Sequence, residues 1–346
     1  GGLHRGRRFV TVGFLKMIRF VVAMVAAPAW AWTATCGAIR MVSPRCPDPL
    51  AGLSFAEQVD ASLKWKFNPK DIHRVLGSWR MMARGEVRRG PISLSGHDNS
   101  DPFMRQEADS FIDNLPIVLF YEPLQYVWAA QLEAEADLVL QEFLEVTGDS
   151  SLESRGNNVW IDAGAGGVED PNALAYGPEW RTLALQVRGV WDPVNVALFP
   201  KTVDLLRRVG APTVEIFFAK MPAGSVINPH SDGCNFHLTS HLGLVVPEGQ
   251  CWLKVGDQKR YWQNGKMMLF DTSVIHAAEN EALTDRYVLM LRVWHPSLSS
   301  TEVEAINWIF NCLDEPELLQ TALEEAATSK GKDRRKSRQR KALRSR

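Results

Sequence analysis

Histidine and carboxylate side chains gather in one short stretch of this 346-residue chain. The segment PHSDGCNFHLTSHLGL, residues 229–244, holds three of its eight histidines. His230 and Asp232 are two positions apart, and at the end of a β-strand this spacing lets both side chains turn to the same side. Two histidines and one carboxylate on one face are a ligand set for iron(II) that leaves other coordination positions open. The HxD pair alone is not specific, because a polar, histidine-rich turn would look the same.

His276 is the candidate third ligand. It follows the strand-like run KMMLFD after the short turn TSVI, 44 positions beyond Asp232. A histidine near a strand end at this sequence separation could lie beside His230 and Asp232 in the folded chain. We therefore predict a metal site formed by His230, Asp232 and His276.

Arg286 begins an apolar strand-like run ten positions after His276. Alternation along the strand points it to the same side as Arg292. A buried cation without a partner is costly, so Arg286 needs an anion. One carboxylate of a dicarboxylate molecule would serve, because arginine can bind a carboxylate through two hydrogen bonds. A salt bridge to Asp285 or Glu281 at the strand edge is the alternative.

His241 is a second candidate for binding the same small molecule. It opens a strand-like run eleven residues after His230, and it could donate a hydrogen bond to the other carboxylate. His237 breaks the alternation of the ligand pair, so we expect it to point away from the ligands and to be structural or to face substrate.

Short β-rich runs separated by turn residues dominate the second half of the chain, which predicts an antiparallel sandwich or barrel. Helical periodicity precedes them in several segments. We therefore predict a mainly β fold with flanking helices. The expected strands are 181–189, 213–221, 241–247, 251–256, 266–271 and 286–294, and the expected helices are 54–84, 124–148 and 193–209.

Taken in order, the blocks PHSDGCN, HLGLVVP, LKVGDQKRYWQNGKMMLFDTSVIH and DRYVLMLRVWHP resemble the aspartyl/asparaginyl β-hydroxylase family. The resemblance runs from about residue 112 to 298. It implies a double-stranded β-helix core, of the jelly-roll or cupin type, and an iron(II)- and 2-oxoglutarate-dependent oxygenase. It also implies that His230, Asp232 and His276 are the catalytic iron ligands. Arg286 would then bind the distal carboxylate of 2-oxoglutarate, and His241 the carboxylate next to the keto group.

The implied reaction uses O2 as cosubstrate and hydroxylates an unactivated carbon while 2-oxoglutarate becomes succinate. The substrate could be the β-carbon of Asp or Asn residues in a protein, or a small molecule or a lipid acyl chain. Asn235 lies in a family-like position and is a candidate substrate contact. A non-catalytic β-helix module that binds a partner through the same pocket is an alternative from another class.

Three positions depart from the animal aspartyl hydroxylases that act on growth-factor-like domains. Those enzymes have glycine where this chain has Asp232, and they have arginine and serine near the cosubstrate where this chain has Thr239 and Ala219. The upstream helical region is also too short for the helical repeat array of those enzymes. The resemblance therefore supports the fold and the iron chemistry more strongly than a protein substrate.

Charge and cysteine content narrow the class of protein further. Net charge is -1, but Lys330 to Arg346 carries ten basic residues and one acidic residue, so the remainder sums to -10. A mildly acidic body argues against a dedicated nucleic-acid-binding fold, whereas the basic tail could contact acidic partners. Five cysteines without a CxxC pair argue against a structural zinc site.

The N-terminal segment resembles a targeting sequence. MIRFVVAMVAAPAWAW, from Met17, has a basic start, an apolar run and a small-x-small cleavage pattern, which predicts a signal peptide and the secretory pathway or ER. The Arg-rich residues before it leave open an organelle transit sequence, and a short signal anchor is a further alternative. No other segment is apolar enough to span a bilayer. The predicted organisation is 1–40 leader, 41–111 linker and helical region, 112–300 oxygenase domain, 301–328 C-terminal helix and 329–346 disordered basic tail.

Overall fold

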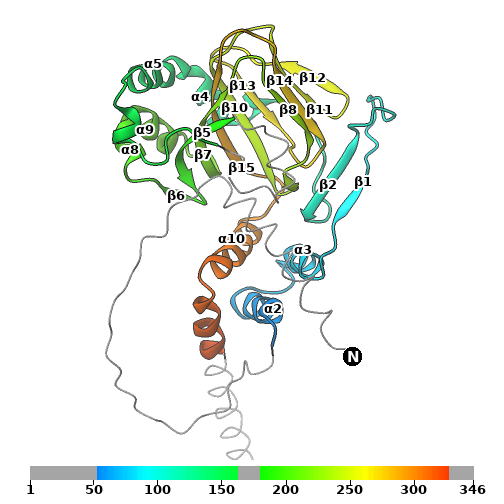
Figure 1. The fold of residues 1–346 in the computed structure, drawn as a ribbon. Coiled ribbons are helices and arrows are strands. Elements are labelled where there is room, and N and C mark those ends of the chain that lie inside the picture. Colours follow the sequence, from blue (N-terminus) through cyan, green and yellow to red (C-terminus); the bar gives the residue numbers. More distant parts are fainter. Residues whose placement is uncertain (1–52, 163–179, 327–346) are drawn as a thin grey trace, which may run out of the picture. The chain divides into compact units, whose positions relative to one another are not determined.

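The computed structural model describes residues 53–162 and 180–326 (Figure 1). The predicted leader and basic tail lie outside the described residues. The described chain divides into a β unit, residues 85–162 with 180–298, and a helical unit, residues 53–84 with 299–326. Within these residues, no helix is long and apolar enough to cross a membrane.

Two capping boxes define helix starts in the helical unit. Ser54 and Glu57 cap the N-terminus of one helix, and Ser299 and Glu302 cap the N-terminus of another. Backbone N–H groups that have no partner within the helix are satisfied in this way at each N-terminus. Arg74 donates two hydrogen bonds of 2.7 Å to the Glu302 carboxylate. The helix predicted over 54–84 is interrupted at 67–72, where the chain contains a proline. The helices are α2 (Phe55–Lys66), α3 (His73–Ala83) and α10 (Ser300–Asp314).

Two antiparallel sheets form the core of the β unit (Figure 1). The larger sheet has the order β3 (Phe120–Tyr121), β13 (Met267–Phe270), β10 (His237–Val245), β15 (Arg286–Trp294), β7 (Thr213–Met221), β5 (Arg181–Val187), β4 (Ile161–Asp162), with β6 (Val190–Trp191) paired to β5. The smaller sheet has the order β12 (Gln258–Tyr261), β11 (Cys251–Val255), β14 (His276–Asn280), β8 (Val226–His230). A third sheet joins β1 (Arg88–Pro91), β2 (Arg105–Ser110) and β9 (Gly233–Cys234).

From β7 to β15 the chain passes repeatedly between the larger and the smaller sheet, with β11 and β12 as a hairpin in the smaller one. This is the topology of a double-stranded β-helix, and it confirms the predicted fold class. The bounds of β7 and β15 are those predicted. The structure places the start of β10 at His237, so His241 lies within the strand and not at its opening.

The apolar core has two layers, because strand side chains alternate between the faces of a sheet. Leu289 and Leu291 of β15 pack with one cluster, on the helix-covered face of the larger sheet, whereas Val288 and Met290 pack with the other cluster, between the two sheets. β15 is therefore a central strand that is covered on both faces. The helices on the outer face are α4 (Val127–Ala134), α5 (Ala136–Thr147), α8 (Asn195–Leu198) and α9 (Pro200–Val209).

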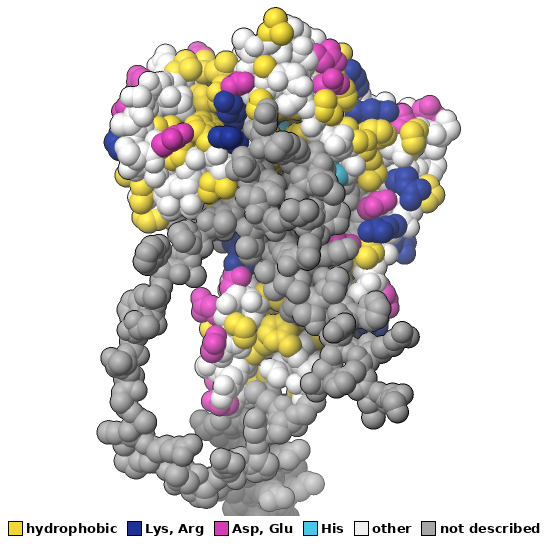
Figure 2. Space-filling model, viewed as in Figure 1, with side chains coloured by type: hydrophobic (Ala, Val, Ile, Leu, Met, Phe, Trp, Pro, Cys, Tyr) yellow, Lys and Arg dark blue, Asp and Glu magenta, His cyan; other side chains and the backbone are white. Residues whose placement is uncertain are grey.

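Charged side chains of both signs are interspersed over the described part of the face drawn in Figure 2. Several surface cations pair with neighbouring acids, such as Lys254 with Asp101, with 2.7 Å between Nζ and a carboxylate oxygen. The described surface on this face therefore presents no extended field of one sign.

Gly243 is required by close packing within β10. A Cβ at this position would lie 2.1 Å from the carbonyl oxygen of Gln263, well inside van der Waals contact. We expect Gly243→Ala to destabilise the protein by about 1–3 kcal/mol or more, the usual cost of overpacking. Thermal melting measures this effect. Gly90→Ala in β1 is the control, because an added Cβ there meets no atom within 4 Å; equal melting temperatures for the two variants would contradict the expectation.

Candidate active site

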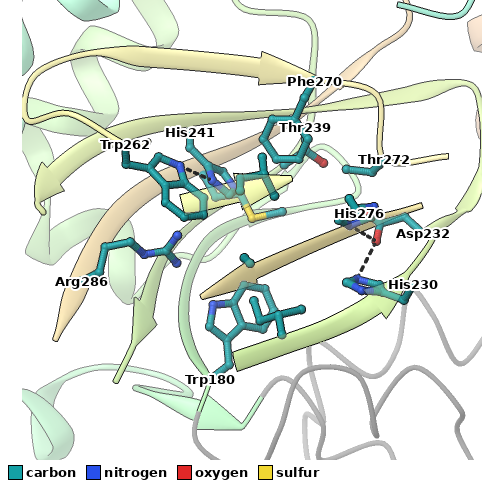
Figure 3. Close-up of a pocket in the computed structure, with 14 residues that line it drawn as sticks. Trp180, His230, Asp232, Thr239, His241, Trp262, Phe270, Thr272, His276 and Arg286 are labelled. Atoms are coloured by element: carbon teal, nitrogen blue, oxygen red, sulfur yellow. Dashed lines mark hydrogen bonds and ion pairs between the residues drawn. The ribbon is translucent and has the colours of Figure 1, made fainter. Parts of the chain in front are cut away.

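His230, Asp232 and His276 lie together at one end of the smaller sheet (Figure 3). His230 is the last residue of β8 and His276 the first of β14, and the two are paired across the antiparallel strands. Their Nε2 atoms each lie 3.7 Å from Oδ1 of Asp232. The backbone N–H of Asp232 donates to the carbonyl oxygen of Thr272 at 2.8 Å, which fixes the turn after β8. The three buried side chains offer ligand atoms that all lie within 4.8 Å of one another.

The backbone sets the tautomer of both histidines. Nδ1 of His230 lies 2.8 Å from the carbonyl oxygen of Asn228, and Nδ1 of His276 lies 2.9 Å from that of Val274. A carbonyl oxygen can only accept, so Nδ1 must carry the hydrogen and donate. Nε2 then carries the lone pair, as a metal ligand requires, and a backbone partner of this kind is usual for ligating histidines.

The charge states also suit a metal. Burial, and after it the neighbouring His276, lower the pKa of His230 to about 4. Burial likewise lowers the pKa of His276. Burial by itself would raise the pKa of Asp232, but Arg292 and the two imidazoles outweigh it and hold that pKa below its ordinary value. At neutral pH the site therefore presents two neutral imidazoles and one carboxylate, which are the forms that bind a metal.

A pocket extends from these three residues between the two sheets (Figure 3). Its two ends are polar. The triad forms one end, and Arg286 lies at the other. Apolar side chains line the space between them: Trp180, Ile227, Leu253, Phe270, Ala278 and Met290.

Arg286 is 1% exposed, and its guanidinium lies 4.4 Å from the centre of the Trp262 ring. Burial lowers its pKa to about 10, so the side chain remains a cation at neutral pH. Asp285, one alternative partner predicted from the sequence, lies instead 2.7 Å from Nζ of Lys220, and Glu281 accepts from Trp252. Within the described ranges Arg286 has no anionic partner, and its Nε has no hydrogen bond. Such an arrangement favours the binding of an anion beside Arg286.

Trp262 fixes the tautomer of His241. Its Nε1 donates to Nδ1 of His241 at 3.1 Å, and the indole N–H can only donate. Burial, and after it Arg286, hold the pKa of His241 well below its ordinary value, so the imidazole is neutral with its hydrogen on Nε2. His241 Nε2 and the Thr239 hydroxyl, both from pocket-lining residues, have no hydrogen-bond partner in the part of the chain that the structure describes. These two buried groups of His241 and Thr239 are therefore candidates to hydrogen-bond a ligand in the pocket.

Asn235 and His237 are both buried and contact other residues of the β unit. Asn235 accepts from the backbone N–H of Ile112 at 2.8 Å and donates to its carbonyl oxygen at 2.9 Å, so its amide joins two backbone segments. Nothing in this geometry favours the substrate contact predicted for Asn235. His237 lies in β10, where alternation gives it the same face as His241, contrary to the expectation that it points away. It is buried beside Cys234, with 3.6 Å between Nδ1 and Sγ.

The structure adds residues that the sequence did not assign to the site. Trp262 is buried in the core cluster between the sheets and contacts both His241 and Arg286. Arg292 donates to the second oxygen of Asp232 at 3.0 Å. The only sequence signal for Arg292 was its even spacing from Arg286. Residues separated by an even number of positions lie on the same face of β15.

Known proteins resemble this chain over the same region. A model of the family described as aspartyl/asparaginyl beta-hydroxylase matches residues 132–296. "Aspartate beta-hydroxylase domain-containing protein 2" of Homo sapiens is 28% identical over 242 residues, which are 67% of this chain and 62% of that protein. The chain thus spans less than two thirds of that relative.

Two further matches differ in their described activity. "Ornithine lipid ester-linked acyl 2-hydroxylase" of Rhizobium tropici is 26% identical over 190 residues, which are 54% of this chain and 64% of that protein. The crystal structure of a Pseudomonas putida prolyl-4-hydroxylase aligns with 47% of this chain and 88% of that chain, at 14% identity and a TM-score of 0.30.

Proposed function

We propose, on the premise that residues 132–296 make this chain a member of the aspartyl/asparaginyl β-hydroxylase family, that it is an iron(II)- and 2-oxoglutarate-dependent dioxygenase. The family match supports a hydroxylase-type oxygenase. The proposal adds the metal, the cosubstrate and the residues that bind them. The single observation that carries it is a pocket with a His-Asp-His triad at one end and, at the other, a buried arginine that has no anionic partner among the described residues.

The shape of 2-oxoglutarate fits the chemistry of this pocket. The molecule has a keto acid at one end, a carboxylate at the other and an apolar two-carbon segment between them. In the proposal the keto acid lies at the triad, and the distal carboxylate accepts hydrogen bonds from Arg286. The Nε2–H of His241 and the hydroxyl of Thr239 donate to the remaining oxygens. Both of these buried groups lack a hydrogen-bond partner among the described residues.

The roles of the chain's own residues follow from this arrangement. His230, Asp232 and His276 would hold iron(II) through Nε2, Oδ1 and Nε2. A bound iron would supply oxygen activation and the oxidation of a C–H bond. The apolar lining of the pocket, including Phe270 and Met290, excludes water around the reacting groups. The overall reaction converts a C–H bond, 2-oxoglutarate and O2 into a C–OH bond, succinate and CO2.

Two substrate classes follow from the relatives. The human relative is named for aspartate β-hydroxylation, and the Rhizobium relative for hydroxylation of a lipid acyl chain. This chain has Asp232 at a position where the animal peptide hydroxylases have glycine. We therefore propose a carbon hydroxylase whose substrate is either an Asp or Asn residue of a protein or an acyl chain, and a comparison of the two classes decides between them.

Anaerobic spectroscopy tests the proposal directly. Iron(II) and 2-oxoglutarate are added to the purified full chain without oxygen, and the visible charge-transfer absorption of the iron–keto acid complex is recorded. Oxygen is then admitted, and succinate is measured with and without Asp/Asn peptides or acyl lipids. Absorption followed by succinate supports the proposal. Absence of both would leave the alternative of a non-catalytic binding module.

Trp262→Phe tests how the cosubstrate contacts are held. The variant keeps an aromatic ring beneath Arg286 but removes the donor to Nδ1 of His241. A single hydrogen bond contributes about 0.5–1.5 kcal/mol, so we expect the KM for 2-oxoglutarate to rise about 2- to 12-fold. Succinate formation at varied 2-oxoglutarate gives the KM.

The matched control is Trp252→Phe in β11, whose indole donates to Glu281 at 2.6 Å on the exposed side of the smaller sheet. Its KM should equal that of the unmodified protein. If both tryptophan variants raise the KM equally, the hydrogen bond to His241 has no specific role.

A further inference from the structure

A buried row of charges lies behind Asp232. Nη2 of Arg292 donates to Oδ2 of Asp232 at 3.0 Å, while Oδ1 of the same carboxylate faces the two histidines. On the other side, Nε of Arg292 lies 3.6 Å from a carboxylate oxygen of Glu215, which is its partner across β15 and β7. All three side chains are about 4–5% exposed. The two oxygens of Asp232 therefore serve different partners.

We propose that Arg292 is a positioning residue for Asp232: it holds Oδ2 in a charge-assisted hydrogen bond and leaves only Oδ1 to the metal. This inference rests on the proposed function, because it takes the triad as a metal site. A carboxylate can bind a metal through one oxygen or two. With Oδ2 engaged by a guanidinium, binding through both oxygens competes with a strong hydrogen bond.

Single-oxygen binding has a consequence for the reaction. A carboxylate that bound a metal through one oxygen would leave one more coordination position for the cosubstrate and O2 than a carboxylate that bound through both. A second bond from Asp232 would occupy a position that the reaction requires. Arg292 thus preserves the number of open positions as well as the orientation of Asp232.

The energetics favour a functional reason for this row. A buried ion pair usually contributes little net stability compared with apolar residues of similar volume. Burial raises the pKa of Glu215, although the charge of Arg292 acts in the opposite direction. Glu215 lies opposite Arg292 on the neighbouring strand, and its carboxylate faces Nε of the guanidinium at 3.6 Å. A stable core does not require a buried row of Glu215, Arg292 and Asp232. The need to orient the Asp232 carboxylate explains it.

Cobalt(II) is the probe, because it binds histidine sites and its visible absorption reports the coordination number. Affinity and spectrum are measured for the full chain without 2-oxoglutarate. We expect Arg292→Met to weaken Co(II) binding about 10- to 100-fold, the usual effect of removing an outer-shell partner of a ligand. Arg292→Lys keeps the charge, and we expect it to restore part of the affinity. If Arg292→Met does not fold, as judged by circular dichroism, Arg292→Lys against the unmodified chain supplies the comparison.

A double-mutant cycle separates positioning from a general structural role. In the Asp232→Ala background the two histidines still bind Co(II) weakly, and Arg292→Met should change that affinity by less than about twofold. An equal loss in both backgrounds, or folded Arg292 variants that match the unmodified chain in affinity and spectrum, would overturn the inference. Failure of the unmodified chain to bind Co(II) would instead refute the proposed metal site itself.

Discussion

Replacing His276 with alanine is expected to weaken metal binding by more than about 100-fold, since loss of an outer-shell partner alone typically costs 10- to 100-fold. The physical reason is the geometry of β8 and β14: His276 lies opposite His230, and Nε2 of both lies 3.7 Å from Oδ1 of Asp232. Without His276, one histidine and one carboxylate remain. The charge-transfer absorption with iron(II) and 2-oxoglutarate should disappear, and succinate formation should fall to background.

The matched control is His237→Asn, because His237 is also buried in the β unit but contacts Cys234 and Trp294. Its metal affinity should stay close to that of the unmodified chain. Melting temperatures of both variants show whether the fold is intact. Retention of the absorption in a folded His276→Ala variant would remove His276 from the ligand set.

The second large effect is expected from Arg286→Met. Truncating one partner of a buried, hydrogen-bonded charge pair typically costs about 2–5 kcal/mol, which corresponds to a rise of about 30-fold to several thousand-fold in the KM for 2-oxoglutarate. The effect is large because Arg286 is 1% exposed, and no other cation lines the pocket in the described part of the chain. Succinate formation at varied 2-oxoglutarate measures the change.

Cosubstrate selectivity gives a sharper readout of the same contact. 2-Oxopentanoate keeps the keto acid of 2-oxoglutarate but ends in a methyl group. The unmodified protein should reject it, since Arg286 would stay buried without an anion, whereas Arg286→Met should nearly lose the discrimination. Arg260→Met in β12 is the control, because that guanidinium also stacks on an aromatic ring, 4.3 Å from the centre of Phe120, but is exposed. Equal selectivity in all three proteins would contradict the proposed role of Arg286.

Several features of this protein could be predicted from local sequence. The bounds of β7 and β15 follow from continuous apolar runs that a two-sided core requires. The HxD spacing at the end of β8, and the shared face of Arg286 and Arg292, follow from two-residue alternation. The strands β8, β12 and β14 were not predicted as strands, because they are short and polar. These three strands form because they hydrogen-bond to neighbouring strands. Their sequences show no apolar periodicity that would predict a strand.

The tertiary structure alone decided which of these side chains meet. His230 and His276 are brought together by the register of β8 against β14, and Arg292 reaches Asp232 across 60 positions of sequence. Trp262 meets His241 through the packing of the two sheets. Asp285 forms its ion pair with Lys220 and not with Arg286. Alternation tells which face a side chain occupies. Register between distant strands is set by the sum of many contacts along both strands, so the partner of each side chain is known only once the sheets are assembled.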